Sequence, residues 1–219
     1  ATMIAFAGLT LELLAMLAHY GSAVMLATAA RYLMAAWTIM VVYFVAEARY
    51  RIRLLGSILM PVALVLMLVA MFVDNAPTDP PPIAGLNTFL AIHVALIFAS
   101  FSLIFLAFAA AILYLLKARA LKGRTALAMD AALPALDTSR QLMNSVFKLA
   151  FPLLTLGLIL GAAYAASHLH GDWFVEPKIV AGTVIWVTYA ALFAGQHLGR
   201  LTPPGLARGV LMLFVIISL

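Results

Sequence analysis

Long apolar runs alternate with short polar breaks along the whole chain, and this alternation predicts seven helical segments. We place them near residues 1–20, 31–48, 54–73, 88–116, 145–167, 179–198 and 209–219. Most of these runs approach the ~20 apolar residues that a helix needs to cross a bilayer, whereas the last is too short. No run shows the alternating polarity of barrel strands, and in lipid only helices and closed barrels satisfy the backbone. The predicted fold is therefore an all-α, polytopic integral membrane helix bundle.

Composition agrees with a membrane protein. Of the 219 residues, 66% are hydrophobic and only 10% are charged, with a mean hydropathy of +1.13. A soluble domain carries roughly a quarter charged residues, so this chain has too few to coat a globule. It contains no cysteine, which excludes disulfides, thiolate metal sites and thiol chemistry. The first residue is Ala1 and no basic leader region precedes it, so we expect no signal peptide and expect that both ends are incomplete.

The positions of the basic residues predict the orientation of the bundle. Eleven of the 13 lysines and arginines fall in three turns that share one side: Arg49, Arg51 and Arg53; Lys117, Arg119, Lys122, Arg124, Arg140 and Lys148; Arg200 and Arg208. Basic turns face the cytoplasm, which predicts a cytoplasmic loop at 117–144. We expect the membrane to be the bacterial inner (cytoplasmic) membrane. Loops 74–87 and 168–178 are then external. The net charge of +5 reports topology, and we expect no nucleic-acid partner.

The cytoplasmic stretch has its own local signals. The fourth segment is long enough to continue as a helix into Lys117–Gly123, and a turn is predicted at Pro134. Asp137 to Ser139 are candidates to cap the helix that follows. We therefore treat residues 1–219 as a single transmembrane bundle with this loop on its inner side.

Ionisable residues inside a span are costly and mark candidate functional sites. Four qualify: Glu12, His19, His93 and His197. Neutral histidine is a common axial ligand of haem iron, and the topology places His19 and His93 near the outer surface and His197 at the inner end. A hydrogen-bonded interfacial role remains the alternative for each histidine. Three roles stay open for Glu12: pairing with a histidine or arginine, relaying protons, or remaining protonated in the core.

Other candidates are weaker. His168 and His170 lie in the external loop, as solvent-facing residues or as ligands. No P-loop, no G-x-S-x-G, no H-E-x-x-H and no workable carboxylate pair is present. The sequence therefore favours a binding or assembly protein over a classical enzyme.

The segment "WFVEPK" (173–178) and its flanks resemble the cytochrome c assembly family of the CcsA/CcmC type. "IWVTYAAL" (185–192) carries tryptophan and tyrosine at the family's spacing, and "AFPLLTLGLILGAAYA" (150–165) matches the preceding span. "IHVALIFASFSLIF" (92–105) matches the helix that begins with a ligating histidine. The chain is most similar to the shorter HemX-like branch, which implies eight spans, one of them before Ala1.

The resemblance implies a protein that binds haem b near the outer face and holds it or delivers it to membrane partners. By position, His93 corresponds to an external ligand of haem iron. His197 corresponds to the family's transmembrane histidine, although it falls about one helical turn later than in the core members. The family's second external histidine has no match by motif in this chain, and His19, His168 or His170 could replace it by location. A porphyrin platform is implied at four further residues: Trp173, Glu176, Pro177 and Trp186.

The chain departs from the family pattern at Val175, where a second tryptophan is expected, and at Glu176, where an aspartate is expected. Two alternatives therefore stay open. One is a haem-free regulatory or assembly protein of tetrapyrrole metabolism that acts through loop 117–144. The other is an accessory transmembrane subunit of a respiratory or electron-transfer complex.

Overall fold

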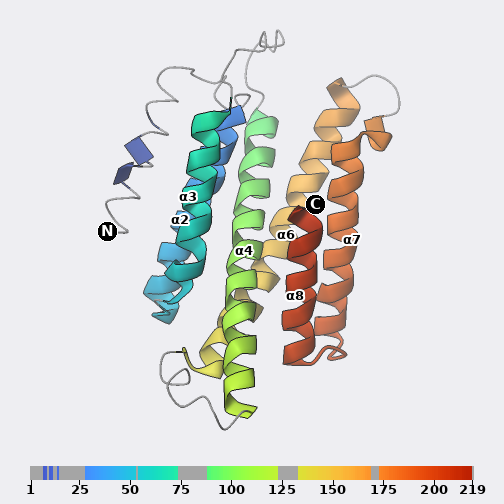
Figure 1. The fold of residues 1–219 in the computed structure, drawn as a ribbon. Helices are drawn as coiled ribbons and strands as arrows, with labels where there is room; N and C mark the ends of the chain where they lie inside the picture. Colours follow the sequence, from blue (N-terminus) through green and yellow to red (C-terminus); the bar gives the residue numbers. More distant parts are fainter. Residues whose placement is uncertain are drawn as a thin grey trace.

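The computed structural model of the chain describes residues 28–52, 54–73, 88–122, 133–168 and 173–218, together with 7, 8, 10, 11 and 14. The regular structure in these residues is helical throughout, which confirms the all-α prediction. The elements are α2 (Thr28–Tyr50), α3 (Leu54–Phe72), α4 (Thr88–Lys122), α6 (Leu136–His168), a 3-10 turn η2 (Trp173–Val175), α7 (Pro177–His197) and α8 (Pro203–Ser218). The long helices lie side by side and alternate in direction (Figure 1).

Five of these helices, α2, α3, α4, α6 and α7, are long and apolar enough to cross a membrane, and α8 is apolar but shorter. The chain is therefore a multi-pass membrane protein. The first predicted segment, 1–20, lies almost wholly outside the described residues, so the total of seven segments stays a prediction. The predicted external loop 74–87 lies outside them too.

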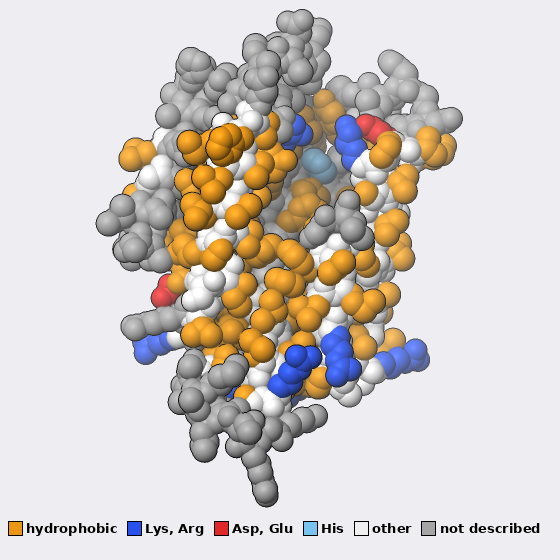
Figure 2. Space-filling view, viewed as in Figure 1, with side chains coloured by type: hydrophobic (Ala, Val, Ile, Leu, Met, Phe, Trp, Pro, Cys, Tyr) orange, Lys and Arg blue, Asp and Glu red, His pale blue; other side chains and the backbone are white. Residues whose placement is uncertain are grey.

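The two ends of the bundle differ in charge. Helices α2, α4 and α7 end, and α3, α6 and α8 begin, at one end, which we call the basic end (Figure 1). Lysine and arginine side chains gather at this end of the face drawn in Figure 2. The opposite end, where α6 ends and η2 and α7 begin, we call the motif end. The charge pattern predicted this shared basic end, and its cytoplasmic location stays a prediction.

Helix α4 is the centre of the bundle because it packs against α6 along much of its length and also contacts α2, α3 and α8. A run of fully buried alanines, Ala109 to Ala111, allows close approach of its neighbours. The buried hydroxyl of Ser100 donates to the carbonyl of Ala150 in α6 at 3.0 Å. Ser102 donates to the hydroxyl of Thr38 in α2 at 2.8 Å. Such interhelical hydrogen bonds add to the van der Waals packing that joins helices in lipid.

Helix α6 begins nine residues before the predicted segment. Leu142, Met143, Val146 and Phe147 are buried against the core, and their helical spacing extends the helix through the polar stretch between them. The predicted loop 117–144 is thus partly helical, with α4 covering 117–122, as predicted, and α6 covering 136–144.

The prediction that Asp137 to Ser139 cap this helix is wrong because the helix has already begun at Leu136. Asp137 lies in the first turn, where its carboxylate accepts a hydrogen bond from Gln141 at 2.8 Å. The backbone amide of Ser139 already donates to the carbonyl of Ala135 at 3.2 Å. The buried hydroxyl of Ser139 has no hydrogen-bond partner among the described residues.

Candidate functional site

His93 lies in the second turn of α4, at the motif end, and is bonded to the backbone of α6. Its Nδ1 atom is 2.6 Å from the carbonyl oxygen of Gly157. A carbonyl oxygen only accepts, so Nδ1 carries the proton and donates it. In the neutral ring the Nε2 atom then keeps its lone pair. This is the arrangement found in metal-ligating histidines, whose second ring nitrogen donates to a carbonyl or carboxylate.

Two glycines of α6 make room for this contact. A Cβ atom on Gly161 would lie 2.5 Å from Cε1 and 2.8 Å from Nδ1 of His93. A Cβ atom on Gly157 would lie 2.8 Å from Cδ1 of Ile97, one turn further along α4. These glycines form the G-x-x-x-G spacing of "GLILG", a pattern typical of close helix contacts in membranes. They are part of the site, although the sequence reasoning above did not single them out.

The surface near His93 is partly open. The side chain of His93 is only partly buried, and Phe89 and Ile92 on the same end of α4 are exposed. Figure 2 shows a hollow in the motif-end half of this face, with a histidine side chain in it, hydrophobic side chains next to it, and lysine or arginine side chains at its rim. A ligand with an apolar body therefore has access to this end of α4.

The other histidines do not join His93 in the described structure. His197 is the last residue of α7, at the basic end, and its exposed ring lies parallel to Phe193 with centroids 6.4 Å apart. The 21 residues of α7 span about 30 Å, so His93 and His197 cannot share one iron atom. His19, His170 and Glu12 lie outside the described residues. His168 ends α6, and its side chain also lies outside them.

Residues 173–178 form a compact entry into α7. The 3-10 turn Trp173–Val175 leads to Glu176, which precedes the helix in an extended conformation, and Pro177 occupies the first turn. Proline suits this position because its fixed φ fits a helix and its missing N–H has no helical partner there. The Glu176 carboxylate pairs with Lys178 at 2.8 Å. Phe174 and Val175 are 58% and 61% exposed, so their side chains are available to a ligand or to lipid.

Trp186 lies in the seam between α6 and α7. Its indole Nε1 donates to the hydroxyl of Thr155 at 2.9 Å, and that hydroxyl donates to the carbonyl of Phe151. The indole also lies nearly parallel to the Phe151 ring, with centroids 6.2 Å apart. Nearby, the buried Tyr189 hydroxyl donates to the carbonyl of Phe147. In this structure both motif aromatics join α7 to α6.

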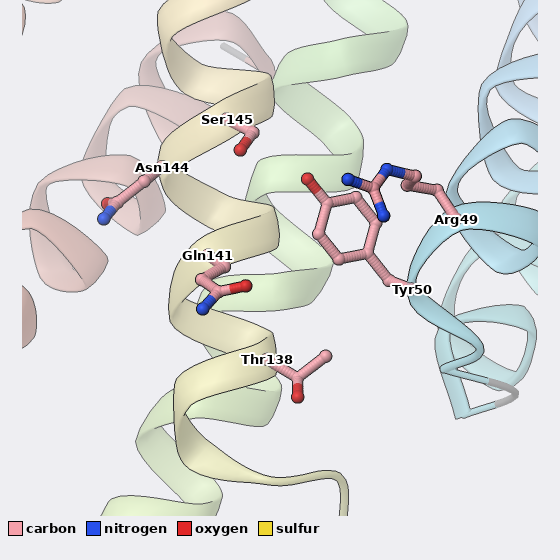
Figure 3. Close-up of a pocket in the computed structure, with 6 residues that line it drawn as sticks. All are labelled: Arg49, Tyr50, Thr138, Gln141, Asn144 and Ser145. Atoms are coloured by element: carbon pink, nitrogen blue, oxygen red, sulfur yellow. The ribbon is translucent and has the colours of Figure 1, made fainter.

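A separate polar cavity of about 500 Å³ lies at the basic end, between α2 and α6 (Figure 3). It is lined by Arg49, Tyr50, Thr138, Gln141, Asn144 and Ser145. It contains no histidine, and it lies at the basic end, away from His93 at the motif end.

The described residues contain no group of three or more histidine, cysteine, aspartate or glutamate side chains able to hold a metal ion. Haem differs, since the porphyrin supplies four nitrogen ligands and the protein adds only the axial ones. A single oriented imidazole such as His93 fits that requirement.

Comparison with known proteins gives a consistent family. CcsA, the cytochrome c biogenesis protein of Porphyra purpurea, is 25% identical over 194 residues, covering 71% of this chain and 61% of the relative. CcsA of Synechocystis is 24% identical over 210 residues, covering 71% and 63%. Protein HemX of Brevibacillus brevis is 24% identical over 141 residues, covering 64% and 52%. The chain thus spans less than two thirds of the length of these relatives.

No solved structure matches the chain. The sequence profile described as "Cytochrome C assembly protein" matches residues 24–216, which include α2 to α8 almost entirely. The family resemblance is therefore confirmed over nearly the whole chain, and the protein belongs to the cytochrome c assembly protein family.

Proposed function

We propose that this protein binds haem b at the motif end of the bundle, with Nε2 of His93 as an axial ligand to the iron. The observation that carries the proposal is the hydrogen bond from Nδ1 of His93 to the carbonyl of Gly157. This bond fixes the tautomer and the ring orientation, and it leaves Nε2 as the only ring nitrogen able to bind iron. Membership of the cytochrome c assembly family supports the choice of haem.

The platform for the porphyrin is the entry into α7. Phe174, Val175 and Pro177 offer apolar surface there, and we assign Trp173 to the same platform. Glu176 pairs with Lys178 at the first turn of α7, and the Trp186 hydrogen bond joins the helix to α6. His19 remains the proposed second axial ligand. His197, at the basic end, would belong to a separate site.

Haem b, when bound, would supply a redox-active iron on a porphyrin that can be handed on. The chain's own residues bind it, orient it and shield one face from water. The proposed role is to hold or deliver haem for cytochrome c maturation, together with other membrane proteins of that assembly. The relatives named cytochrome c biogenesis protein CcsA support this role.

A reduced-minus-oxidised absorption spectrum of the purified protein tests the proposal. We expect a b-type Soret band and α-band that are lost in His93→Ala and kept in the control variant Val187→Ala, at an exposed position of α7. Preparation from a haem-replete host as a colourless, folded protein would overturn the proposal.

The second candidate is a haem-free regulatory or assembly role on the same scaffold, including that of an accessory subunit. It is favoured by one observation, the presence of Val175 and Glu176 where the family motif has tryptophan and aspartate. This candidate predicts a colourless protein whose partner is lost when residues 123–132 are replaced by a neutral linker. That replacement leaves α4 and α6 intact, so a pull-down from membranes separates a loop contact from general unfolding.

A further inference from the structure

A second cavity, of about 590 Å³, opens at the basic end between the last turns of α4, the first turn of α6 and the first turns of α8. Its lining residues are Tyr114, Leu115, Ala118, Arg119, Leu121, Leu136, Pro204, Arg208 and Leu211. It shares none of these with the polar cavity of Figure 3 or with the surroundings of His93.

The spacing of the lining residues shows that two helix faces form this cavity. On α8, Pro204, Arg208 and Leu211 follow the i, i+4, i+7 spacing of one helix face. On α4, Tyr114, Ala118 and Leu121 have the same spacing. On the side of the cavity away from the basic end, the ring of Phe214 on α8 joins the two helices. It stacks on Phe108 with centroids 4.0 Å apart and meets Phe105 edge-on with centroids 4.9 Å apart. Towards the basic end the helices leave space between them.

The walls and the rim of the cavity differ in chemistry. Leucines, an alanine and a proline make most of the wall, and Leu121 is 58% exposed at its edge. Arg119 on α4 and Arg208 on α8 contribute two exposed guanidinium groups from opposite sides. Figure 2 shows lysine and arginine side chains beside one another at this end of the bundle. The occupant must therefore combine an apolar body with a negative charge.

We propose that this cavity binds an anionic phospholipid, with its phosphate between Arg119 and Arg208 and an acyl chain along the leucine wall. Guanidinium groups bind phosphate oxygens through paired, charge-assisted hydrogen bonds. Basic pockets between transmembrane helices on the cytoplasmic side are where anionic lipid headgroups bind, and this cavity lies at the basic end of a membrane bundle. The proposal is independent of haem binding at the motif end.

Native mass spectrometry of the purified protein tests this site, with phosphatidylglycerol and phosphatidylcholine of identical acyl chains as probes. We expect the protein to retain phosphatidylglycerol in preference to phosphatidylcholine. The double variant Arg119→Gln, Arg208→Gln should lose about tenfold or more of that preference, because each hydrogen bond to a charged group contributes that order of affinity. The matched variant Arg140→Gln removes an exposed charge at the same end without touching the cavity, and it should keep the preference.

Competition with inorganic phosphate separates a lipid from a soluble anion. Retention of phosphatidylglycerol in millimolar phosphate supports a site that needs the acyl chain. Displacement by phosphate alone would overturn the lipid assignment in favour of a soluble phosphate. Equal retention of both lipids, or an equal loss in Arg140→Gln, would overturn the proposal as well. Unchanged retention of phosphatidylglycerol in the double variant would overturn it too.

Discussion

The imidazole of His93 is bonded to the carbonyl of Gly157 and lies against Gly161, so one helix of the pair supplies the ring and the other supplies its orientation. The two partners of the bond are 64 residues apart in sequence. Because the carbonyl belongs to a helix that packs tightly on α4, the ring cannot turn without losing its hydrogen bond. The candidate ligand is therefore held by backbone rather than by a flexible side chain.

Gly161→Ala should disturb this ligand without removing it. The new Cβ would lie 2.5 Å from Cε1 of His93, so the ring or the helix must shift. We expect a lower haem-to-protein ratio and a shifted α-band, with an overpacking cost of about 1–3 kcal/mol in the free energy of unfolding. Gly182→Ala is the control because its Cβ would meet only a flexible leucine end at 3.2 Å. Full haem content with an unchanged spectrum in Gly161→Ala would contradict the assigned geometry.

Trp186→Phe separates a structural role from direct haem contact. Phenylalanine keeps a ring beside Phe151 but loses the hydrogen bond to Thr155. We expect the free energy of unfolding in detergent to fall by about 0.6–1.7 kcal/mol, the range for interhelical hydrogen bonds in membranes, with haem content unchanged. Thr155→Val should give a similar fall, and the double variant should add little more. Loss of haem at unchanged stability would instead place Trp186 against the porphyrin.

Val175→Trp restores aromatic surface at the exposed entry to α7. Val175 is 61% exposed, so the larger ring fits without repacking. Aromatic contacts contribute about 0.5–1.5 kcal/mol beyond area, so haem should bind roughly two- to tenfold more tightly. Val187→Trp, at an exposed position further along α7, serves as the control. Equal affinity of both variants for haem would argue against a platform at 173–178.

Tyr189→Phe tests the buried hydrogen bond to the carbonyl of Phe147. Its removal should lower the free energy of unfolding by about 1 kcal/mol, measured by denaturant titration in mixed micelles. Thr183→Val is matched to it, because that hydroxyl donates only within its own helix, to Ile179 at 2.8 Å. Equal stability of Tyr189→Phe and the parent protein would show that the bond adds nothing to the seam.

The absence of cysteine makes orientation directly measurable. Val175→Cys and Arg140→Cys place single thiols at exposed positions on the motif and basic ends. If the basic end is cytoplasmic, an impermeant maleimide added to intact spheroplasts should label the Val175→Cys thiol at once and the Arg140→Cys thiol only after lysis. The reverse pattern would invert the topology proposed from the basic turns.

The sequence predicted the helical class, the family and most helix positions because hydropathy and motif order are local properties. The start of α6 was placed too late for a physical reason. A hydropathy average over this stretch is lowered by the polar residues Arg140, Gln141, Asn144 and Lys148. The buried residues between them nevertheless recur at helical spacing, and this spacing is what continues the helix. A count of helical spacing through this stretch would have found it.

The candidate site was predictable only in part. The sequence singled out His93, but its tautomer depends on a carbonyl oxygen, and carbonyl positions follow from packing rather than from residue type. The signal for that packing was present in the G-x-x-x-G spacing of residues 157–161. A motif comparison likewise could not predict that Trp186 lies between α6 and α7, because its partner Thr155 becomes a neighbour only when these two helices pair.

Hydrogen bonds across the seam between α6 and α7 fix the register of these two helices. Three donors of α7 meet acceptors of α6: Trp186 with Thr155, Tyr189 with Phe147, and Gln196 with Asn144. Much of the rest of α7 is open to lipid, and lipid does not discriminate between one apolar position and the next. A slide of one helical turn, about 5.4 Å, would leave all three donors without these acceptors. Helix α7 and the entry segment that leads into it are therefore held in one position along α6 and do not slide.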